Sequence, residues 1–332
     1  MIDTWIPDLD AIPVLDEASV SQVRERVRSV GAALPPIVVA NMVLVASELA
    51  MNQLHHARSG LVAVRSLERD GVSGLEIVAG DQGDGIRDPR HAFAAHGVSQ
   101  TGLGVGLGSV RKLAREIDVA VCLQEGTCIW ARAFASPVTR RREVGIFGRP
   151  HRTEQVSGDL ATFVRTPSSL VVALVDGLGH GLEARAASHA AIRSFSQHPE
   201  SPGEQILESC HEAIGKTRGA VMTVARVDEV GGVVHASGVG NVTLSVSSPK
   251  TSKRFEGSSF VLGVQRPMHR ARTEEVSLGS HAAVILFSDG ITTRATLDDR
   301  PELLREQPIV IAQELVKDFG RDDDDVTVLV AR

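Results

Sequence analysis

The sequence is poor in the residues that build nucleic-acid surfaces. It has no Tyr, two Trp and nine Phe among 332 residues, and its formal net charge is -6. Few aromatic rings leave little surface on which bases could stack, and an acidic balance argues against a broad nucleic-acid surface. We therefore expect no nucleic-acid partner.

Cysteine and long apolar runs are also scarce. Cys122, Cys128 and Cys210 are the three cysteines, without a CxxC or Cys-x5-Arg spacing, so a disulfide framework and a cysteine-based phosphatase site are excluded. The N-terminal stretch has no basic region followed by an apolar core, and no uninterrupted apolar run reaches the roughly 20 residues of a membrane helix. We expect a cytoplasmic protein with no membrane partner.

The length favours two domains. Helical patterns over 17–33 and 37–57, paired strand patterns, a helix over 107–117 and a hairpin over 119–133 predict an α/β sandwich. Beyond a proline and three consecutive arginines, strand patterns dominate, which predicts a β-sandwich flanked by helices. We place the first domain at 1–136, a linker at 137–144 and the second domain at 145–332.

Three spaced motifs in the first domain carry chemistry. They are SELAMNQLHHA with Glu48 and Asn52, GDQGDGI with Asp81, Gly83 and Gly85, and TGLGVGLGSVRKLA with Gly102, Gly104, Gly106 and Gly108. A carboxylate near an amide oxygen can polarise a nucleophile and hold Mg²⁺. Glycines let backbone N–H groups approach phosphates. No GxxxxGK[ST] occurs and no strand pattern leads into the glycine-rich stretch, so a P-loop and a Rossmann site are excluded.

The ordered trio resembles the N, G1 and G2 boxes of the GHKL (Bergerat) ATP-binding fold. Within that group, residues 15–135 look most like the anti-sigma-factor serine/threonine switch kinases of bacterial stress modules. The resemblance implies ATP and Mg²⁺ as cofactors, Glu48 as general base toward a protein hydroxyl, Asn52 as Mg²⁺ ligand, Asp81 as adenine reader and the glycine-rich stretch as a lid over the phosphates. His55 and His56 follow the N box, and we interpret both as ordinary helix residues.

In the second domain, aspartates lie where apolar strand patterns begin or end. They are Asp159, Asp176, Asp289 and the tetrad Asp322, Asp323, Asp324 and Asp325. A turn would explain any one of them, but together they predict a gathering at one end of a sandwich. Clustered carboxylates repel unless a cation lies among them, and oxygen ligands favour Mg²⁺ or Mn²⁺. Two such ions can share a hydroxide that attacks phosphorus in line, without a protein nucleophile.

The motifs GD, VDGLGHG, FSDG and DDVTVLV, in this order, resemble the metal-dependent protein phosphatases (PPM type) in their SpoIIE-like branch, over about 143–332. The resemblance implies an αββα sandwich and two Mn²⁺ or Mg²⁺ ions. The implied metal ligands are Asp159, Asp176, Asp289, the pair Asp324 and Asp325, and the Gly177 carbonyl. On the family's pattern Asp324 is the ligand of the tetrad, with Asp325 beside it. Asp322 and Asp323 would be surface charge. His180 could approach the metals or be held within its loop, and residues 239–246 are interpreted as a strand and turn.

Together the two resemblances predict a bifunctional signalling enzyme that phosphorylates and dephosphorylates Ser or Thr on regulatory proteins. The implied partners are STAS-domain antagonists or stressosome-type scaffold proteins, with a downstream phosphatase or sigma-factor regulator as a further candidate. Two alternatives remain open: only the phosphatase turns over, with the first half a nucleotide sensor, or the first half is a non-catalytic partner-binding module. The oligomeric state does not follow from the sequence.

Overall fold

The chain folds into two compact units, Met1–Glu143 and Val144–Arg332. The computed structural model describes Trp5 and residues 10–94, 106–249, 251–264, 271–279 and 281–332. Residues 135–143, at the end of the first unit, form neither helix nor strand.

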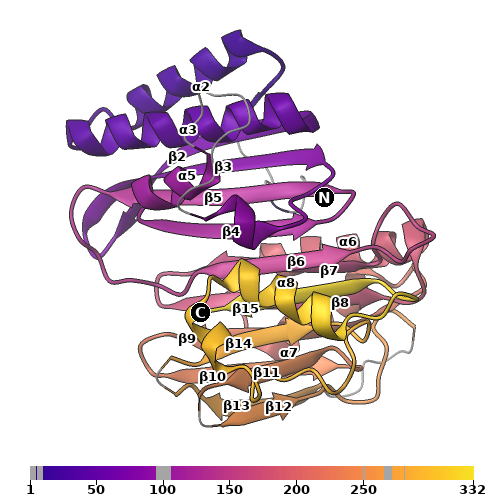
Figure 1. Ribbon diagram of the computed structural model, residues 1–332. Helices are drawn as coiled ribbons and strands as arrows, with labels where there is room; N and C mark the ends of the chain where they lie inside the picture. Colours follow the sequence, from indigo (N-terminus) through magenta and orange to yellow (C-terminus); the bar gives the residue numbers. More distant parts are fainter. Residues whose placement is uncertain (1–4, 6–9, 95–105, 250, 265–270, 280) are drawn as a thin grey trace. The chain divides into compact units, whose positions relative to one another are not determined.

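The first unit is an antiparallel sheet with helices on one face (Figure 1). Its strand order is β1-β2-β3-β5-β4, with β1 Ala11–Pro13, β2 Ala57–Arg69, β3 Val72–Gly83, β4 Glu116–Cys122 and β5 Gly126–Phe134. Its helices are α2 Glu17–Val30, α3 Pro36–His56, α4 Pro89–Ala92 and α5 Leu107–Leu113. The predicted α/β sandwich is confirmed.

The two long helices form where the apolar periodicity predicts them. Asp16 caps α2 by accepting the backbone N–H of Ser19 at 2.8 Å, and α2 buries a stripe that includes Val20, Val23 and Val27. Helix α3 begins at a proline, whose missing N–H costs nothing in a first turn. It buries Leu49 and its neighbours while Glu48 stays partly exposed.

Helix α3 is also, among the described residues, the one helix long and apolar enough to cross a membrane by length and composition. A core helix of a globular domain meets the same test. Here α3 packs on the sheet through Gln53, whose side-chain amide donates to the carbonyls of Leu61 and Gly80 at 3.1 and 3.0 Å.

The predicted helix over 107–117 is too long. Helix α5 ends at Leu113, and Ala114 already has extended backbone angles. The next residues pair with β5 instead: the N–H of Arg115 donates to the Arg132 carbonyl at 2.7 Å, and Ile117 lies opposite Ala131. Burial of Ile117 in the sheet outweighs the helical propensity of this stretch.

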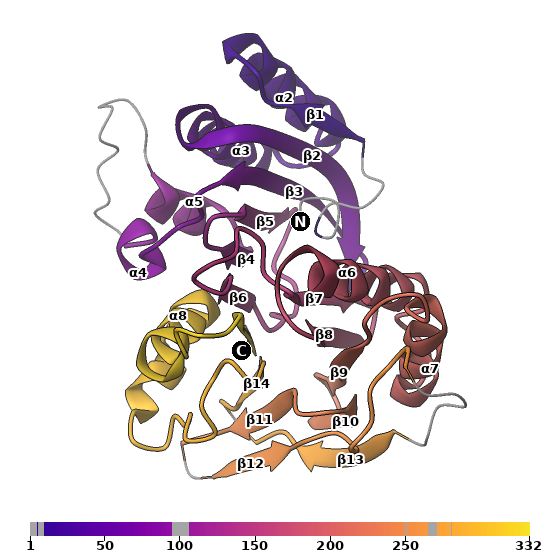
Figure 2. The ribbon, with the colours of Figure 1, turned by 90° about the vertical axis from the view of Figure 1, so that its right-hand side faces the viewer.

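The second unit is a sandwich of two antiparallel sheets covered by helices, so the predicted αββα architecture is confirmed (Figure 2). One sheet has the order β6-β15-β14-β11-β12, with β6 Val144–Arg149, β15 Val326–Ala331, β14 Ala283–Phe287, β11 Thr243–Ser247 and β12 Ser252–Phe255. The other has the order β13-β10-β9-β8-β7, with β13 Arg272–Ser277, β10 Val233–Val239, β9 Ala220–Asp228, β8 Ser169–Gly177 and β7 Asp159–Arg165.

Each sheet of this unit has its own helical cover. Helices α6 Gly181–Gln197 and α7 Gly203–Ala213 pack on the β8 sheet, and α8 Pro308–Phe319 packs on β6 and β15; a 3₁₀ turn, Pro301–Arg305, precedes α8. The outer cover is close: a Cβ on Gly145 would lie 2.1 Å from the backbone nitrogen of Ile309. The sandwich therefore holds the strand ends rigidly, which matters for the side chains that they carry.

Candidate functional sites

Asp159 and Asp176 lie side by side at one end of the β8 sheet. Asp159 opens β7 and is directly opposite Asp176, which is followed by the last residue of β8. Asp159 is 3 % exposed, and its pKa is raised, chiefly by burial and also by the charges of Asp325, Asp289 and Asp324. The pKa of Asp176 is also raised, by burial and then by the charge of Asp159. The strands thus hold two carboxylates side by side, and one of them is almost fully buried.

Asp289 and Asp324 approach this pair from the other sheet. Asp289 follows the end of β14 and Asp324 precedes β15, and these two strands are neighbours. The charges of both aspartates raise the pKa of Asp176. Burial, and then the charge of Asp289, raises the pKa of Asp324 itself. The four predicted strand-end carboxylates therefore share one electrostatic neighbourhood between the two sheets.

The tetrad separates into exposed and inward members. The Asp322 side chain is 96 % exposed and lies 3.5 Å from Arg149, and Asp323 is exposed. Asp324 is partly buried, and its Oδ1 accepts the N–H of Asp325 at 2.9 Å. Asp325 is 3 % exposed and accepts backbone N–H groups from His151 and Gly158.

Two further residues contact the aspartate cluster, and neither was predicted from the sequence as a site residue. The side-chain amide of Asn241 donates to Oδ2 of Asp289 at 2.9 Å, and the Ser288 side chain hydrogen-bonds Asp159. We interpreted 239–246 as a strand and turn, which is correct for the backbone but omits Asn241. The signal was present: Asn241 follows an apolar strand and a glycine, so it occupies a strand end as the aspartates do.

Gly177 and His180 lie between β8 and α6. A Cβ on Gly177 would lie 2.2 Å from the Ala184 carbonyl oxygen, so only glycine permits this approach of α6. The Nδ1 of His180 lies 2.7 Å from a Glu154 carboxylate oxygen, and its ring stacks on His151 with centroids 4.9 Å apart. His180 therefore contacts side chains of the β6–β7 connection, and these contacts are not the backbone bonds within its own loop that we considered.

In the first unit, α3 and the start of α5 meet at the predicted base. Oε2 of Glu48 accepts the backbone N–H of Gly106 at 3.1 Å. Gly106 has φ 67° and precedes α5, where Gly108 is buried. Asn52 lies one turn beyond Glu48 on α3 and is partly buried. Gly102 and Gly104 lie outside the described residues.

Asp81 lies at the end of β3, where two glycines shape its surroundings. Its Oδ1 accepts the N–H groups of Gly83 at 2.8 Å and Thr127 at 3.3 Å. Burial nevertheless raises the pKa of Asp81. Gly85 has φ 76°, and a Cβ there would lie 2.9 Å from the Cys122 carbonyl oxygen. A partly buried carboxylate can accept a hydrogen bond from the amino group of a purine.

Residues 166–332, half of the chain, match the family model described as Stage II sporulation protein E (SpoIIE). The chain belongs to the SpoIIE family. Residues 14–133 match the model of the histidine kinase-like ATPase domain. A SpoIIE-type PPM domain thus follows an ATPase domain of this type in one chain, as both resemblances predicted.

Two curated relatives come from Bacillus subtilis (strain 168). The serine/threonine-protein kinase RsbT is 38 % identical over 85 residues, which are 26 % of this chain and 64 % of RsbT, less than two thirds of its length. The phosphoserine phosphatase RsbU is 22 % identical over 249 residues, covering 68 % of this chain and 72 % of RsbU.

Two solved structures match the fold of one part of the chain. One, from work described as "The bacterial stressosome: a modular system that has been adapted to control secondary messenger signaling", is 31 % identical with a TM-score of 0.54, over 58 % of this chain and all of that one. The other, RsbX in complex with magnesium, is 20 % identical with a TM-score of 0.52, over 59 % of this chain and 96 % of that one.

The SpoIIE-type unit offers ligand atoms of the kind that bind the divalent ions used by its family. The cluster offers carboxylate oxygens, and the buried Oδ2 of Asp159 has no hydrogen-bond partner among the described residues. A cation would offset the repulsion that raises the pKa values of Asp159 and Asp176. In the described part of the chain, no three acidic, His or Cys side chains already surround a common point as a finished metal site would. The candidate carboxylate ligands lie near one another, and they would have to move closer together to bind an ion.

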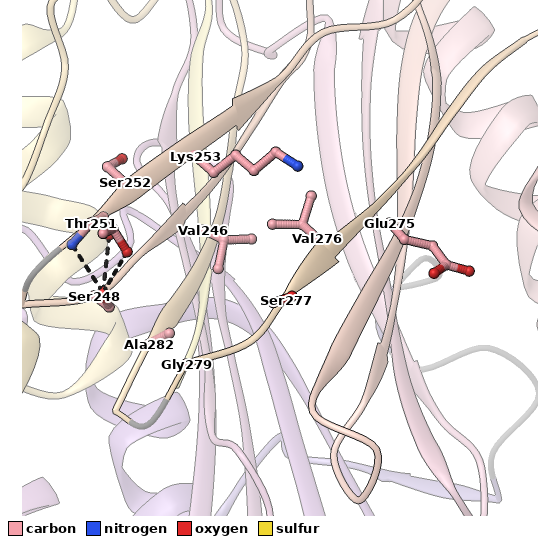
Figure 3. Close-up of a pocket in the computed structure, with 10 residues that line it drawn as sticks. All are labelled: Val246, Ser248, Thr251, Ser252, Lys253, Glu275, Val276, Ser277, Gly279 and Ala282. Atoms are coloured by element: carbon pink, nitrogen blue, oxygen red, sulfur yellow. Dashed lines mark hydrogen bonds between the residues drawn. The ribbon is translucent and has the colours of Figure 1, made fainter.

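A hollow of about 420 Å³ lies elsewhere in the SpoIIE-type unit (Figure 3). Hydroxyl groups, small apolar side chains, Lys253 and Glu275 line it. It borders the end of β11 at Val246 and Ser248, whereas Asn241 precedes the opposite end of that strand. The hollow therefore does not include the strand-end aspartates.

Proposed function

We propose that this chain is a bifunctional signalling enzyme. Its second unit would remove phosphate from Ser or Thr of a regulatory protein with the help of two Mn²⁺ or Mg²⁺ ions, and its first unit would transfer phosphate from ATP to such a residue. The observation that carries the proposal is the gathering of Asp159, Asp176, Asp289 and Asp324 at one end of a SpoIIE-type sandwich.

In the phosphatase reaction the chain's own residues bind and orient. Asp159, Asp176, Asp289 and Asp324 would hold the ions, with the Gly177 carbonyl as a further ligand. Bound ions of this kind supply a hydroxide at neutral pH and neutralise charge on the phosphoryl group. Asn241 holds one oxygen of Asp289 by donating to it. Ser288 does the same for Asp159.

In the kinase reaction Glu48 would accept the proton of the attacking hydroxyl, and Asn52 would ligate the Mg²⁺ that accompanies ATP. Asp81 would accept the adenine amino group. The proposed partners are STAS-domain antagonists or stressosome-type scaffold proteins. The similarity of the chain to the serine/threonine-protein kinase RsbT and to a structure described under the bacterial stressosome supports this proposal. We place the protein in the cytoplasm, because none of its three cysteines forms a disulfide.

One observation favours a second candidate, in which only the phosphatase turns over. Oε2 of Glu48 already accepts the N–H of Gly106, although a carboxylate has further lone pairs that can accept a substrate hydroxyl. If no substrate hydroxyl reaches them, the first unit binds nucleotide as a sensor.

Intact-mass spectrometry of a STAS-domain protein incubated with ATP and Mg²⁺ tests both activities. We expect a mass increase of roughly 80 Da, one phosphate group, that accumulates with the Asp289→Asn variant and is removed again by the wild-type chain. An Asp289→Asn chain that yields no adduct would support the sensor. Hydrolysis of p-nitrophenyl phosphate with Mn²⁺ tests the phosphatase alone, and no turnover by the wild-type chain would refute it.

A further inference from the structure

Asp325 uses both oxygens of its carboxylate on backbone groups. Oδ1 accepts the N–H of His151 at 2.7 Å, and Oδ2 accepts the N–H of Gly158 at 2.8 Å. The side chain is 3 % exposed. Charge-assisted bonds of this kind are stronger than neutral ones, and burial keeps water from competing for them. One carboxylate therefore brackets both ends of the segment 151–158, which connects β6 to β7.

The bracketed segment sets the position of a predicted metal ligand. Gly158 immediately precedes Asp159, and its carbonyl accepts the Ser188 hydroxyl. A Cβ on Gly158 would lie 2.8 Å from Cβ of Ala184 and 3.0 Å from Oδ2 of Asp325. The backbone of Gly158 is thus held between α6 on one side and the Asp325 carboxylate on the other. These contacts fix the position of the next residue, Asp159, at the start of β7.

The other end of the segment contacts the loop between β8 and α6. His151, whose N–H binds Asp325, stacks its ring on His180, and His180 contacts Glu154 of the segment. These contacts tie the segment to the residues just before α6. Loss of the bracket would therefore release the β6–β7 connection together with its contacts to the loop that follows Asp176.

Asp324 differs from its neighbour in each of these respects. It is partly exposed, it accepts one N–H from Asp325, and the charge of Asp289 acts on it. Both carboxylates lie near the acidic strand ends, since the charges of both raise the pKa of Asp159. Of the two, Asp325 is the one whose carboxylate accepts backbone N–H groups of 151–158.

We propose that Asp325 is a positioning residue that holds the segment 151–158, and through it Asp159, in place, and that it is not itself a metal ligand. Its positioning role rests on the proposed metal-dependent phosphatase function. The bracket itself does not, because it consists of hydrogen bonds between the Asp325 carboxylate and backbone groups of this chain. This assignment leaves Asp324 as the member of the tetrad that faces the metal.

Amide hydrogen exchange in the metal-free full-length chain tests the bracket. Asp325→Ala should speed exchange at both His151 and Gly158 by about tenfold or more, because each N–H loses a charged acceptor. Asp325→Asn keeps one acceptor oxygen and should expose only one of the two amides. The matched control Asp323→Ala removes an exposed carboxylate two residues away and should change neither. Unchanged exchange at both amides in Asp325→Ala would overturn the proposal.

A second measurement separates positioning from ligation. Asp325→Asn should weaken Mn²⁺ binding in calorimetry by about tenfold to a hundredfold, as loss of an outer partner does, and saturating Mn²⁺ should restore turnover of p-nitrophenyl phosphate. Asp289→Asn, which removes a ligand, should stay inactive at any Mn²⁺ concentration. An Asp325→Asn chain that saturating Mn²⁺ does not restore would assign Asp325 as a ligand.

If the variants do not fold, hydrogen exchange of the wild-type chain alone can test the proposal. Its His151 and Gly158 amides should be protected without metal, and exchange at the rate of exposed loop amides would contradict the bracket. If the wild-type chain does not hydrolyse p-nitrophenyl phosphate, the proposed function fails while the exchange result still decides the bracket.

Discussion

The carboxylate of Glu48 accepts the backbone N–H of Gly106, 58 residues further along the chain, at 3.1 Å. This bond joins the N-box helix to the last residue before α5. Gly106 belongs to the glycine-rich stretch that the resemblance predicts to cover the phosphates of ATP.

Replacement of Glu48 by Gln should abolish phosphotransfer while nucleotide binding persists. Gln keeps an oxygen that can accept from Gly106 but cannot take a proton, so the rate should fall by about a hundredfold or more. Partner phosphorylation measured by mass spectrometry and binding of fluorescent ADP provide the two readouts. Glu25→Gln, on the exposed side of α2, is the control and should match wild type. An unchanged phosphorylation rate in Glu48→Gln would exclude Glu48 as the base.

Removal of the Asn241 amide should slow the phosphatase. Asn241→Ala leaves Oδ2 of Asp289 without its donor, and the loss of an oriented bond to a carboxylate should lower turnover of p-nitrophenyl phosphate by about tenfold. Steady-state kinetics over a range of Mn²⁺ concentrations check this. Asn41→Ala, on α3 of the other unit, is the control. Equal kinetics for Asn241→Ala and wild type would mean that the hydrogen bond to Asp289 does not contribute to turnover.

The pH dependence of stability should reveal the buried carboxyl of Asp81. Its pKa is raised, mainly by burial, so the folded state binds the proton more tightly than the unfolded state does. Its stabilising contribution is complete below pH 3.8, the ordinary pKa, and is lost as pH rises through the folded pKa. As the pH rises from acidic to neutral, the free energy of unfolding of the wild type should therefore fall relative to that of Asp81→Asn.

Tryptophan fluorescence during urea unfolding can measure this difference, because Trp5 and Trp130 both lie in the first unit and no tryptophan lies in the second. Asp84→Asn, an exposed neighbour, is the control. A constant difference between Asp81→Asn and wild type across the pH range would show that the Asp81 pKa is not raised.

Two glycines in turns of the first unit should respond differently to substitution. Gly126 has φ 134°, and a Cβ there would lie 2.0 Å from the carbonyl oxygen of Asp81. Gly126→Ala should lower the free energy of unfolding by about 2 kcal/mol or more and weaken nucleotide binding, since Asp81 must shift. Gly71 has φ 73° with no atom within 4 Å of a Cβ, so Gly71→Ala should cost only about 1 kcal/mol of backbone strain. Equal losses in urea unfolding would mean that the close approach to Asp81 is not maintained.

Periodicity and strand-end position predicted most of the architecture and the acidic neighbourhood. Helices α2 and α3 lie where the spacing of their apolar residues predicts them. A helix with apolar side chains along one face can bury that face in only one orientation. Helix α5 was predicted too long because a local pattern does not show that Ile117 pairs with Ala131. The ion pairs of Arg132 with Glu76 and Asp118, all buried in the first unit, were also missed. Cross-strand partners are not visible in the sequence.

The sequence alone determined that aspartates would stand at the ends of buried strands, and that both domains would have the folds their motifs resemble. Only the tertiary structure decided which members of the tetrad face inward and what each one contacts. The physical reason is distance along the chain: the groups that bind Asp325 lie 174 and 167 residues earlier. Four neighbouring carboxylates of identical chemistry can be told apart only by the donors that the packed sheets bring to them.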